Sequence, residues 1–428
     1  MLLTTNNRIK SKNRVKLAIL KELTRASKDL HNKALYTIRQ HFFEHKEYLN
    51  YTKVYHLLKS SDEYKRLPSN ASQQTLKQAD NAFKSFFKLL KVKKDTKVHI
   101  PRYLDKDGHY KVIYTKAHLK IVDNGYIRLS LPKHIKERYN VNFIYFKIPK
   151  HIINKNIKEV HILPYKPHYK ISFVYSDGDR NYKHYHTDDI MGIDLGIDNL
   201  ATIVTRYDKP LILDGKSLKS KNRYFNKKIS VLQSSITKGK SPKENKNSPL
   251  FKKLHIWQSR RQNYIKDYLH KTATKIINIA IERGIKTIAI GYNKEWKQKC
   301  DLGRKNNEKF LSIPHSKLLH YIKYRATQHN IEVIETEESY TSKCDVLALK
   351  EIQKHQSYKG KRVKRGLFQS SVGKLINADV NGALNILRKS VACDSLIQEI
   401  ASRGLVFQPV RVYLHPYKSS CKRSPRYN

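Results

Sequence analysis

The segment from Ile190 to Thr205 constrains the fold of this chain more than any other, because it places an acidic side chain inside an apolar strand. Ile190 to Leu195 is a short apolar run, and the turn residues 196–199 separate it from a second apolar run. This pattern predicts two strands joined as a β-hairpin. Asp194 lies within the first strand, where a carboxylate is costly unless it is paired or binds a metal.

Other aspartates crowd the same hairpin, at positions 188, 189 and 198, in a chain whose formal net charge is +50. Bare acid beside a polyanionic ligand is unfavourable unless a cation lies between them. The alternative interpretation is a turn aspartate that caps the hairpin, and this fits Asp198 well. For Asp194 we favour a metal ligand, because a second acidic motif occurs downstream.

The excess of basic residues indicates a nucleic-acid partner. Lysine and arginine total 86 against 36 aspartate and glutamate residues, and the excess extends along the whole chain of 428 residues. A spread of this kind favours nucleic acid over a local membrane patch. The 28 tyrosines, interleaved with basic residues, suit backbone contacts combined with base stacking.

Targeting and cysteine signals favour a cytoplasmic, nucleoid-associated protein with no membrane partner. The first residues are studded with lysine and arginine, unlike a signal peptide, and no apolar stretch is long enough to cross a bilayer. Cys300, Cys344, Cys393 and Cys421 form no pair with the CxxC spacing, which favours reduced thiols in a reducing compartment.

The first half of the chain predicts helices followed by short strands. Residues 14–48, and the stretch after the turn at 67–70, carry apolar residues at helical spacing. Lys77, Lys84 and Lys88 lie beside the apolar stripe of the second helix, from where they would reach phosphates. From about Val98 the period changes to two, which predicts a small β-barrel. The expected strands are 100–103, 110–114, 119–122, 126–131, 143–148, 160–163 and 169–175.

The second half predicts strands that alternate with helices. Two long basic helical stretches, 218–236 and 254–283, indicate an antiparallel helical arm inserted between strands. Residues 285–290 and 331–336 read as strands on either side of a helix over 315–329. Residues 341–376 form a basic insertion, and a helix over 380–389 follows. From about Phe407 we expect a loosely ordered tail.

Asp194 and Asp379 together suggest two-metal chemistry. A two-metal nuclease needs carboxylates from distant segments to hold two Mg²⁺ ions about 3.5–4 Å apart, where one activates water and the other stabilises the leaving oxygen. Three acids suffice, because Mg²⁺ also binds waters and phosphate oxygens. The alternative for Asp379, which precedes the last helix, is a helix N-cap, and the two roles can coexist.

Four segments carry a family resemblance: Gly192–Asn199, Glu338–Lys343, Lys364–Phe368 and Asn377–Ala383. They resemble the TnpB (OrfB) family of transposon-encoded, RNA-guided DNA nucleases, which have a RuvC-like domain of RNase H fold and are similar to compact type V CRISPR effectors. The resemblance covers residues 188–390, and the first half matches only in layout. It implies that Asp194 and Asp379 are the first and last catalytic aspartates.

The resemblance also implies partners and an arrangement of domains. A guide RNA from the transposon end would select target double-stranded DNA, which is cut with Mg²⁺ beside a short flanking motif, and we expect a monomer on the RNA. Lys343, Lys361, Arg362, Lys364 and Arg365 of the insertion would bind nucleic acid. The expected domains are a wedge β-barrel over 1–12 and 96–186, a helical recognition domain over 13–95, a RuvC-like nuclease over 187–340 (arm 216–284) and 377–392, the basic insertion over 341–376 and a tail over 393–428.

The insertion departs from the family in its cysteines. Family members usually carry a zinc ribbon of two CxxC pairs there, but Cys344 stands alone. Leu347 occupies the second position, and Ser370, Ser371 and Val372 lie around the place of the other pair. Coordination of zinc by four thiolates is therefore impossible, and we expect no zinc.

The middle acid is the other departure. Many members end the strand before the middle motif in Glu, whereas Gly291 follows Ile290 here. We predict that Glu338 supplies the missing carboxylate, because the strand 331–336 would run beside the Asp194 strand and lead into an acidic cluster. Strand alternation would place Glu335 and Glu337 on one face and Glu338 on the other. The alternatives are a solvent-facing acidic strand end, or Glu295 as the ligand.

Three other functions remain open from the sequence. Gly291 favours a nuclease-dead relative that represses by RNA-guided occupancy, and the two retained aspartates oppose it. A guide-free enzyme, either a RuvC-like resolvase or a transposase accessory protein, lacks an evident strand-transfer motif and fits the net charge of +50 poorly. A basic structural RNA-binding protein leaves the acidic cluster unexplained.

Overall fold

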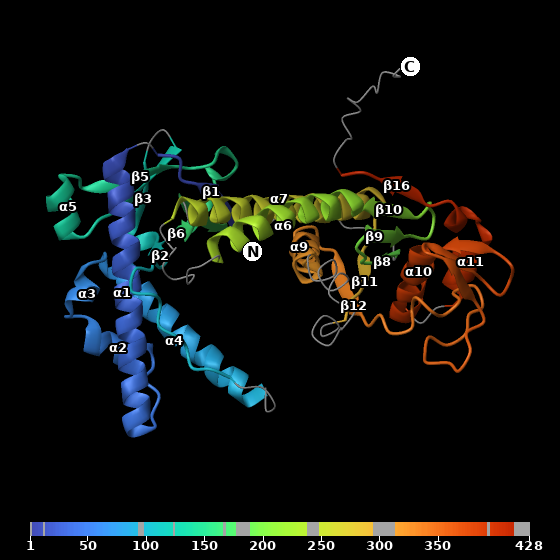
Figure 1. Cartoon of the computed structure of the whole chain (residues 1–428), viewed down its shortest axis with the longest axis horizontal. Helices are drawn as coiled ribbons and strands as arrows, with labels where there is room; N and C mark the ends of the chain where they lie inside the picture. Colours follow the sequence, from blue (N-terminus) through green and yellow to red (C-terminus); the bar gives the residue numbers. More distant parts are fainter. Residues whose placement is uncertain are drawn as a thin grey trace, which may run out of the picture. The chain divides into compact units, whose positions relative to one another are not determined.

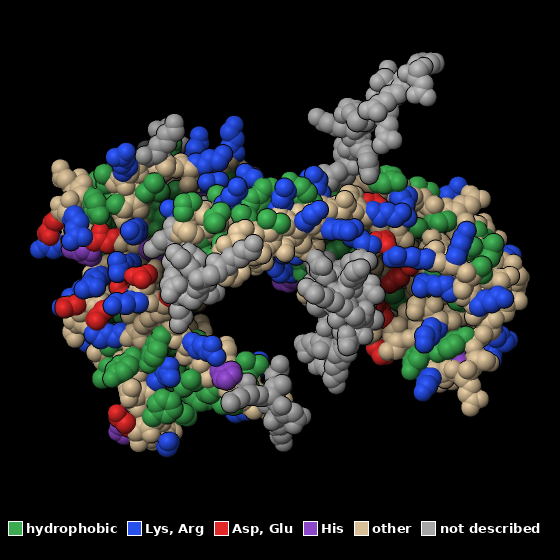
Figure 2. Space-filling model, in the orientation of Figure 1, with side chains coloured by type: hydrophobic (Ala, Val, Ile, Leu, Met, Phe, Trp, Pro, Cys, Tyr) green, Lys and Arg blue, Asp and Glu red, His purple; other side chains and the backbone are tan. Residues whose placement is uncertain are grey.

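A computed structural model of the chain describes residues 2–11, 13–92, 98–122, 125–165, 168–176, 189–237, 248–293, 313–391 and 394–414 (Figure 1). The chain divides into two compact units, residues 1–180 and 181–428. On the face drawn in Figure 2, lysine and arginine side chains are spread over both units. No helix in the described ranges is long and apolar enough to cross a membrane.

Two long helices, α1 (Arg14–His45) and α4 (Ser69–Val92), dominate the helical part of the first unit. The side chain of Asn13 caps α1 by accepting a hydrogen bond from the backbone N–H of Lys16. The apolar stripes predicted from the sequence pack against each other, with Leu20 and Phe83 fully buried. Short helices α2 (Tyr51–Leu58) and α3 (Asp62–Lys65) connect them, and their length gives too little periodicity for prediction.

The strands of the first unit form two antiparallel sheets. The four-stranded sheet has the order β1-β7-β6-β2, and the three-stranded sheet has the order β3-β4-β5. The first sheet contains β1 (Leu2–Arg8), β2 (Val112–Thr115), β6 (Asn156–Tyr165) and β7 (His168–Ser176). The second contains β3 (Leu119–Val122), β4 (Tyr126–Ser130) and β5 (Phe143–Lys147). Between these lie η1 (Lys116–His118), α5 (Lys133–Tyr139) and η3 (Lys150–Ile152).

One predicted strand of this unit is wrong. Residues 98–111 contain no strand, although 100–103 has the expected pattern. Side chains of α1 bind this segment instead: Asn32 exchanges two hydrogen bonds of 2.9 Å with the backbone of Leu104, and the Lys28 ammonium donates to the carbonyl of Lys106. The backbone groups that a sheet would pair are therefore satisfied by a helix.

A six-stranded sheet organises the second unit, with the order β12-β11-β8-β9-β10-β16. The predicted hairpin is confirmed as β8 (Ile190–Asp194) and β9 (Asn199–Val204), which pair antiparallel, and β10 (Leu211–Asp214) pairs antiparallel with β9. On the other side of β8, β11 (Thr287–Gly291) and then β12 (Glu332–Thr336) run parallel to it. The prediction that β12 lies beside the Asp194 strand is therefore wrong, because β11 separates them.

The C-terminal part of the unit is more ordered than the sequence indicates. β16 (Val410–Val412) pairs parallel with β10 and completes the sheet, so the predicted loose tail from Phe407 is wrong as far as residue 414. Helix α11 (Asp394–Ser402) and η4 (Leu405–Phe407) precede β16. The prediction fails here because β16 has only three residues, which are too few to show a period of two. Its backbone partners come from β10, which is distant in the chain.

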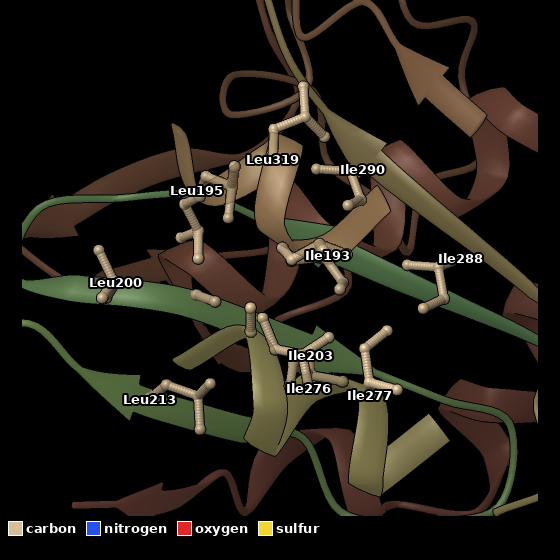
Figure 3. Close-up of a cluster of buried hydrophobic side chains, with 14 of the residues drawn as sticks. Ile193, Leu195, Leu200, Ile203, Leu213, Ile276, Ile277, Ile288, Ile290 and Leu319 are labelled. Carbon is tan, nitrogen blue, oxygen red and sulfur yellow. The ribbon is translucent and has the colours of Figure 1, made fainter. Parts of the chain in front are cut away.

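Helices cover both faces of this sheet. The predicted arm is confirmed as α6 (Lys216–Thr237) and α7 (Pro249–Glu282), which lie side by side (Figure 1). The arm's α7 and α9 (His315–Thr327) bury one face, where Ile193, Ile276 and Leu319 belong to one apolar core (Figure 3). Helix α10 (Ala378–Val391) covers the opposite face through a second core that includes Ile190, Val204 and Ile386.

The basic insertion has a small antiparallel sheet of its own, with the order β13-β14-β15. Its strands are β13 (Lys361–Lys364), β14 (Leu367–Gln369) and β15 (Leu375–Asn377), and β15 runs directly into α10. Phe368 and Ile376 pack from this sheet into the core under α10. The insertion is therefore anchored next to the helix that carries Asp379.

Candidate metal centre

Asp194 ends β8 with its side chain toward α10. Strand alternation explains this orientation, because its neighbour Ile193 packs into the core on the opposite face. A Cβ atom at Gly382 of α10 would lie 3.0 Å from Asp194 Oδ2, so the carboxylate contacts the helix backbone where it has no side chain. Burial, reinforced by the nearby charges of Glu338 and Asp379, raises the pKa of Asp194, and Arg362 partly opposes this.

Asp379 lies in the first turn of α10. The side-chain oxygen of Asn377 accepts hydrogen bonds from the backbone N–H groups of Asp379 at 3.0 Å and Val380 at 3.3 Å. Asn377 is therefore the residue that caps the helix, and the N-cap interpretation of Asp379 is wrong. The Asp379 carboxylate instead accepts a hydrogen bond of 2.5 Å from Asn199 Nδ2.

Glu338 lies just beyond β12, and its side chain fills the space beside Gly291. A Cβ atom at Gly291 would lie 2.7 Å from Glu338 Cγ and 2.9 Å from Glu338 Oε1. The backbone of Glu338 is held on both sides, since its N–H donates to Asn293 Oδ1 and its carbonyl accepts from Thr341. Burial raises the pKa of Glu338 to about 7. Its position is set by the parallel pairing of β11 with β12, which places Gly291 opposite Thr336.

The predicted alternation of the neighbouring glutamates is wrong. Glu335 pairs with Lys323 of α9, whereas Glu337 pairs with Lys389 of α10 at 3.1 Å, and these helices cover opposite faces. Alternation fails because β12 ends at Thr336, before Glu337. Both glutamates therefore have lysine partners on the two helices. Glu295, the other candidate ligand, lies outside the described residues.

The three acids come from different parts of the chain and approach the same place. Asp194 and Glu338 lie at the carboxyl ends of β8 and β12, and Asp379 lies at the start of α10. The charges of Glu338 and Asp379 both act on the Asp194 carboxylate, so both acids lie near it. Burying several carboxylates together is unfavourable unless protons or cations compensate their charge.

The donor chemistry of this site fits Mg²⁺. Within the described residues, no group of three His, Cys, Asp or Glu side chains is arranged so that it could hold a metal ion as it stands. Mg²⁺ nevertheless needs only a few carboxylate oxygens from the protein, because it retains several of its bound waters. Asn199 Oδ1 and the Thr202 hydroxyl are buried without a hydrogen-bond partner among the described residues, and Thr202 pairs in register with Asp194. Orphaned polar atoms of this kind favour a hydrated ion nearby.

Basic residues of the insertion extend to this site. Lys361, Arg362, Lys364 and Arg365, on β13 and the turn after it, are exposed, and Arg362 is near enough to lower the pKa of Asp194. Arg365 forms an ion pair with Asp198, whose other oxygen pairs with Lys219 of α6 at 2.6 Å. The Asp198 carboxylate thus ties the hairpin turn to α6 and to the insertion through two ion pairs.

The remaining predicted nucleic-acid contacts are accessible. Lys343 is exposed, and its ammonium lies 5.9 Å from the centre of the Tyr358 ring. In the first unit, Lys88 is exposed, Lys77 lies over the Tyr51 ring, and Lys84 pairs with Asp80 at 2.7 Å. The same unit has a basic cleft of about 1020 Å³ between α1, α3 and α5 that the sequence did not reveal. Its cations are Lys21, Arg25, Lys28, Lys65, Arg66, Lys106 and Arg138.

A carboxylate joins the two loops that would carry the CxxC pairs. Asp345 Oδ2 accepts hydrogen bonds from Ser370 Oγ at 2.8 Å and from both the backbone N–H and Oγ of Ser371, at 2.7 and 2.9 Å. Asp345 Oδ1 accepts a further bond from the N–H of Leu347. Asp345 and Ser370 are both buried. No sequence signal singles out Asp345, because its partners lie about 25 residues away.

Two family models match the chain. The model described as "Probable transposase" (OrfB of the IS605 type) matches residues 173–297, and the model described as "Cas12f1-like, TNB domain" matches residues 315–386. The TnpB-like protein ORF457 of Acidianus two-tailed virus is 26% identical over 425 residues, covering 87% of this chain and 83% of the relative. The resemblance to the TnpB family is confirmed. The first model includes Asp194, and the second includes Glu338 and Asp379.

The fold agrees with a solved type V structure. A Cas12f1 in complex with single guide RNA and target DNA is similar with a TM-score of 0.60 at 15% identity, over 88% of this chain and 83% of that chain. This likeness concerns the fold, because the sequences are too different to show more. The chain therefore shares the overall fold of this Cas12f1.

Proposed function

We propose that this protein is an RNA-guided DNA endonuclease in which Asp194, Glu338 and Asp379 hold two Mg²⁺ ions. The observation that carries the proposal is the side chain of Glu338, which lies in the volume that a side chain at 291 would require. A carboxylate is thus supplied next to the strand end where family members usually have one. The nuclease-dead alternative rested on the absence of that carboxylate.

Each part of the site has a separate role in the proposed reaction. When bound, two Mg²⁺ ions activate the attacking water and stabilise the leaving oxygen. Asp194 and Glu338 approach from the ends of β8 and β12, which lie on either side of β11, and Asp379 approaches from the helix α10. Arg362 lies on the same side and would contact a phosphate of the strand to be cut. The carboxylates repel one another when no cation is present, so their burial favours cation binding.

The basic surfaces would bind the nucleic acids by shape and charge. We propose that a guide RNA from the transposon end pairs with target double-stranded DNA next to a flanking motif, with a monomer of the protein on the RNA. The basic cleft of the first unit and the exposed lysines of α4 are surfaces for phosphate backbones. We assign the first unit to the wedge (1–12 and 96–186) and recognition (13–95) domains, with a closed barrel as part of that proposal.

Paired cleavage and binding assays test this function. We expect Asp194→Asn, Glu338→Gln and Asp379→Asn to abolish Mg²⁺-dependent cutting of a guide-matched target, while gel-shift affinity stays within about threefold of the parent. Glu335→Gln is the matched control, because Glu335 pairs with Lys323 and should be dispensable for cutting. Undiminished cutting by Glu338→Gln would exclude Glu338 as a ligand. A parent that binds guide and target but never cuts would establish the repressor instead.

A further inference from the structure

Asn199 occupies a rigid position next to the candidate metal centre. It is the first residue of β9, directly after the turn that follows Asp194. The turn is held by two backbone hydrogen bonds, from Gly196 to Leu200 and from Gly215 to Asp198, and by the ion pairs of Asp198 with Lys219 and Arg365. These contacts, with the start of α6 and with the basic insertion, hold the backbone on which the Asn199 side chain is mounted.

The two ends of the Asn199 amide have different surroundings. Nδ2 donates a hydrogen bond of 2.5 Å to Asp379 Oδ2, whereas Oδ1 is buried and has no hydrogen-bond partner among the described residues. An amide oxygen of this kind is costly unless a donor reaches it. The Asp379 oxygen beside the amide accepts the bond from Nδ2, and no donor among the described residues reaches Oδ1. A group that binds to the site, such as a water, would supply the missing donor.

We propose that Asn199 is a positioning residue for the metal centre. Its N–H fixes the orientation of the Asp379 carboxylate, and its carbonyl oxygen accepts a hydrogen bond from a water bound to Mg²⁺. This inference rests on the proposed nuclease function. It also explains the residue type, since Asp at this position would lack the donor for Asp379, and Ala would lack both donor and acceptor.

Iron-mediated cleavage of the polypeptide measures metal binding separately from DNA cutting. Fe²⁺ replaces Mg²⁺ in oxygen-ligand sites, and with ascorbate and peroxide it cuts the backbone near the ion. In the full chain bound to its guide RNA, we expect cuts near 194, 338 and 379 that Mg²⁺ suppresses. Asn199→Ala should raise the Fe²⁺ concentration for half-maximal cutting about 10- to 100-fold. Asn222→Ala is the control, because Asn222 is another buried asparagine with a hydrogen bond, to Arg261.

A second variant separates positioning from a merely structural role. Asn199→Asp retains the acceptor, so half-maximal cutting by Fe²⁺ should occur at or below the parent's concentration. DNA cleavage at saturating Mg²⁺ should still fall at least tenfold, because Asp379 no longer has its donor. An Asn199→Ala midpoint equal to the parent's, or an Asn199→Asp midpoint as weak as that of Asn199→Ala, would overturn the inference. Absence of any localised cutting in the parent would instead overturn the proposed function.

Discussion

Gly291→Ala should damage both the stability and the activity of this protein, because of one added methyl group. The new Cβ atom would overlap with Ile386 Cδ1 and would lie 2.7 Å from Glu338 Cγ and 2.9 Å from Glu338 Oε1. Carbon atoms pack at about 3.5–4.0 Å, so both side chains must move. Overpacking of a buried site costs about 1–3 kcal/mol. In a unit of this size, that lowers the unfolding midpoint by about 2–12 °C.

The loss of activity should exceed the loss of stability. Displacing Glu338 moves a proposed metal ligand, and misplacement by about 1 Å costs on the order of 100-fold in rate. Scanning calorimetry of the full chain measures the loss of stability, as the change in the midpoint of the unfolding transition that Mg²⁺ shifts. Single-turnover cleavage at matched target binding measures the loss of activity.

Moving the acid back to position 291 provides the reciprocal test. Gly291→Glu alone should be inactive, because its side chain competes with Glu338 for one volume. The triple variant Gly291→Glu, Glu338→Ala, Ile386→Val removes the competing carboxylate and the overlap with Ile386 Cδ1. It should cut at least tenfold faster than the single variants Gly291→Glu and Glu338→Ala. If Gly291→Ala changes neither the unfolding midpoint nor the cleavage rate, Glu338 does not occupy this place and the reasoning fails.

Three further predictions concern stability and metal content, and a fourth concerns nucleic-acid binding. Asp345→Ala leaves the donors of Ser370 and Ser371 unpaired, so it should destabilise the insertion by about 1–3 kcal/mol. Amide hydrogen exchange in β14 and β15 should become faster, and unchanged exchange would contradict this prediction. Elemental analysis of the parent should find well under one zinc per chain. Burial lowers the pKa of His31 to about 4, so between about pH 6.5 and 4 the unfolded state binds a proton that the folded state does not. The free energy of unfolding should therefore fall by about 3 kcal/mol as the pH drops through that window. In acid titrations, His31→Leu should remove this dependence on pH. Replacing Arg362 and Lys364 with Gln should flatten the dependence of log affinity on log salt by about 0.9 for each phosphate that is no longer neutralised, and an unchanged slope would exclude them from the interface.

Much of the second unit was predictable from local pattern. The β8–β9 hairpin and the α6–α7 arm follow from periods of two and of 3.6 residues, which depend only on neighbours in the chain. The candidate ligands Asp194 and Asp379 were visible because each acid interrupts or precedes an apolar element. The strand predicted over 100–103 was wrong because its backbone binds α1, and no local signal shows which partner a backbone group takes.

Residue types and most local elements can be inferred from the order of residues alone, and these sufficed for the hairpin, the arm and the family resemblance. Three features became evident only in the folded chain: β11 lies between β8 and β12, β16 completes the sheet, and Glu338 fills the space beside Gly291. Strand order and register depend on contacts between segments that are distant in the chain, and those contacts are selected by the packing of the whole core. The position of a carboxylate that reaches across from a neighbouring strand end is therefore a property of the folded sheet.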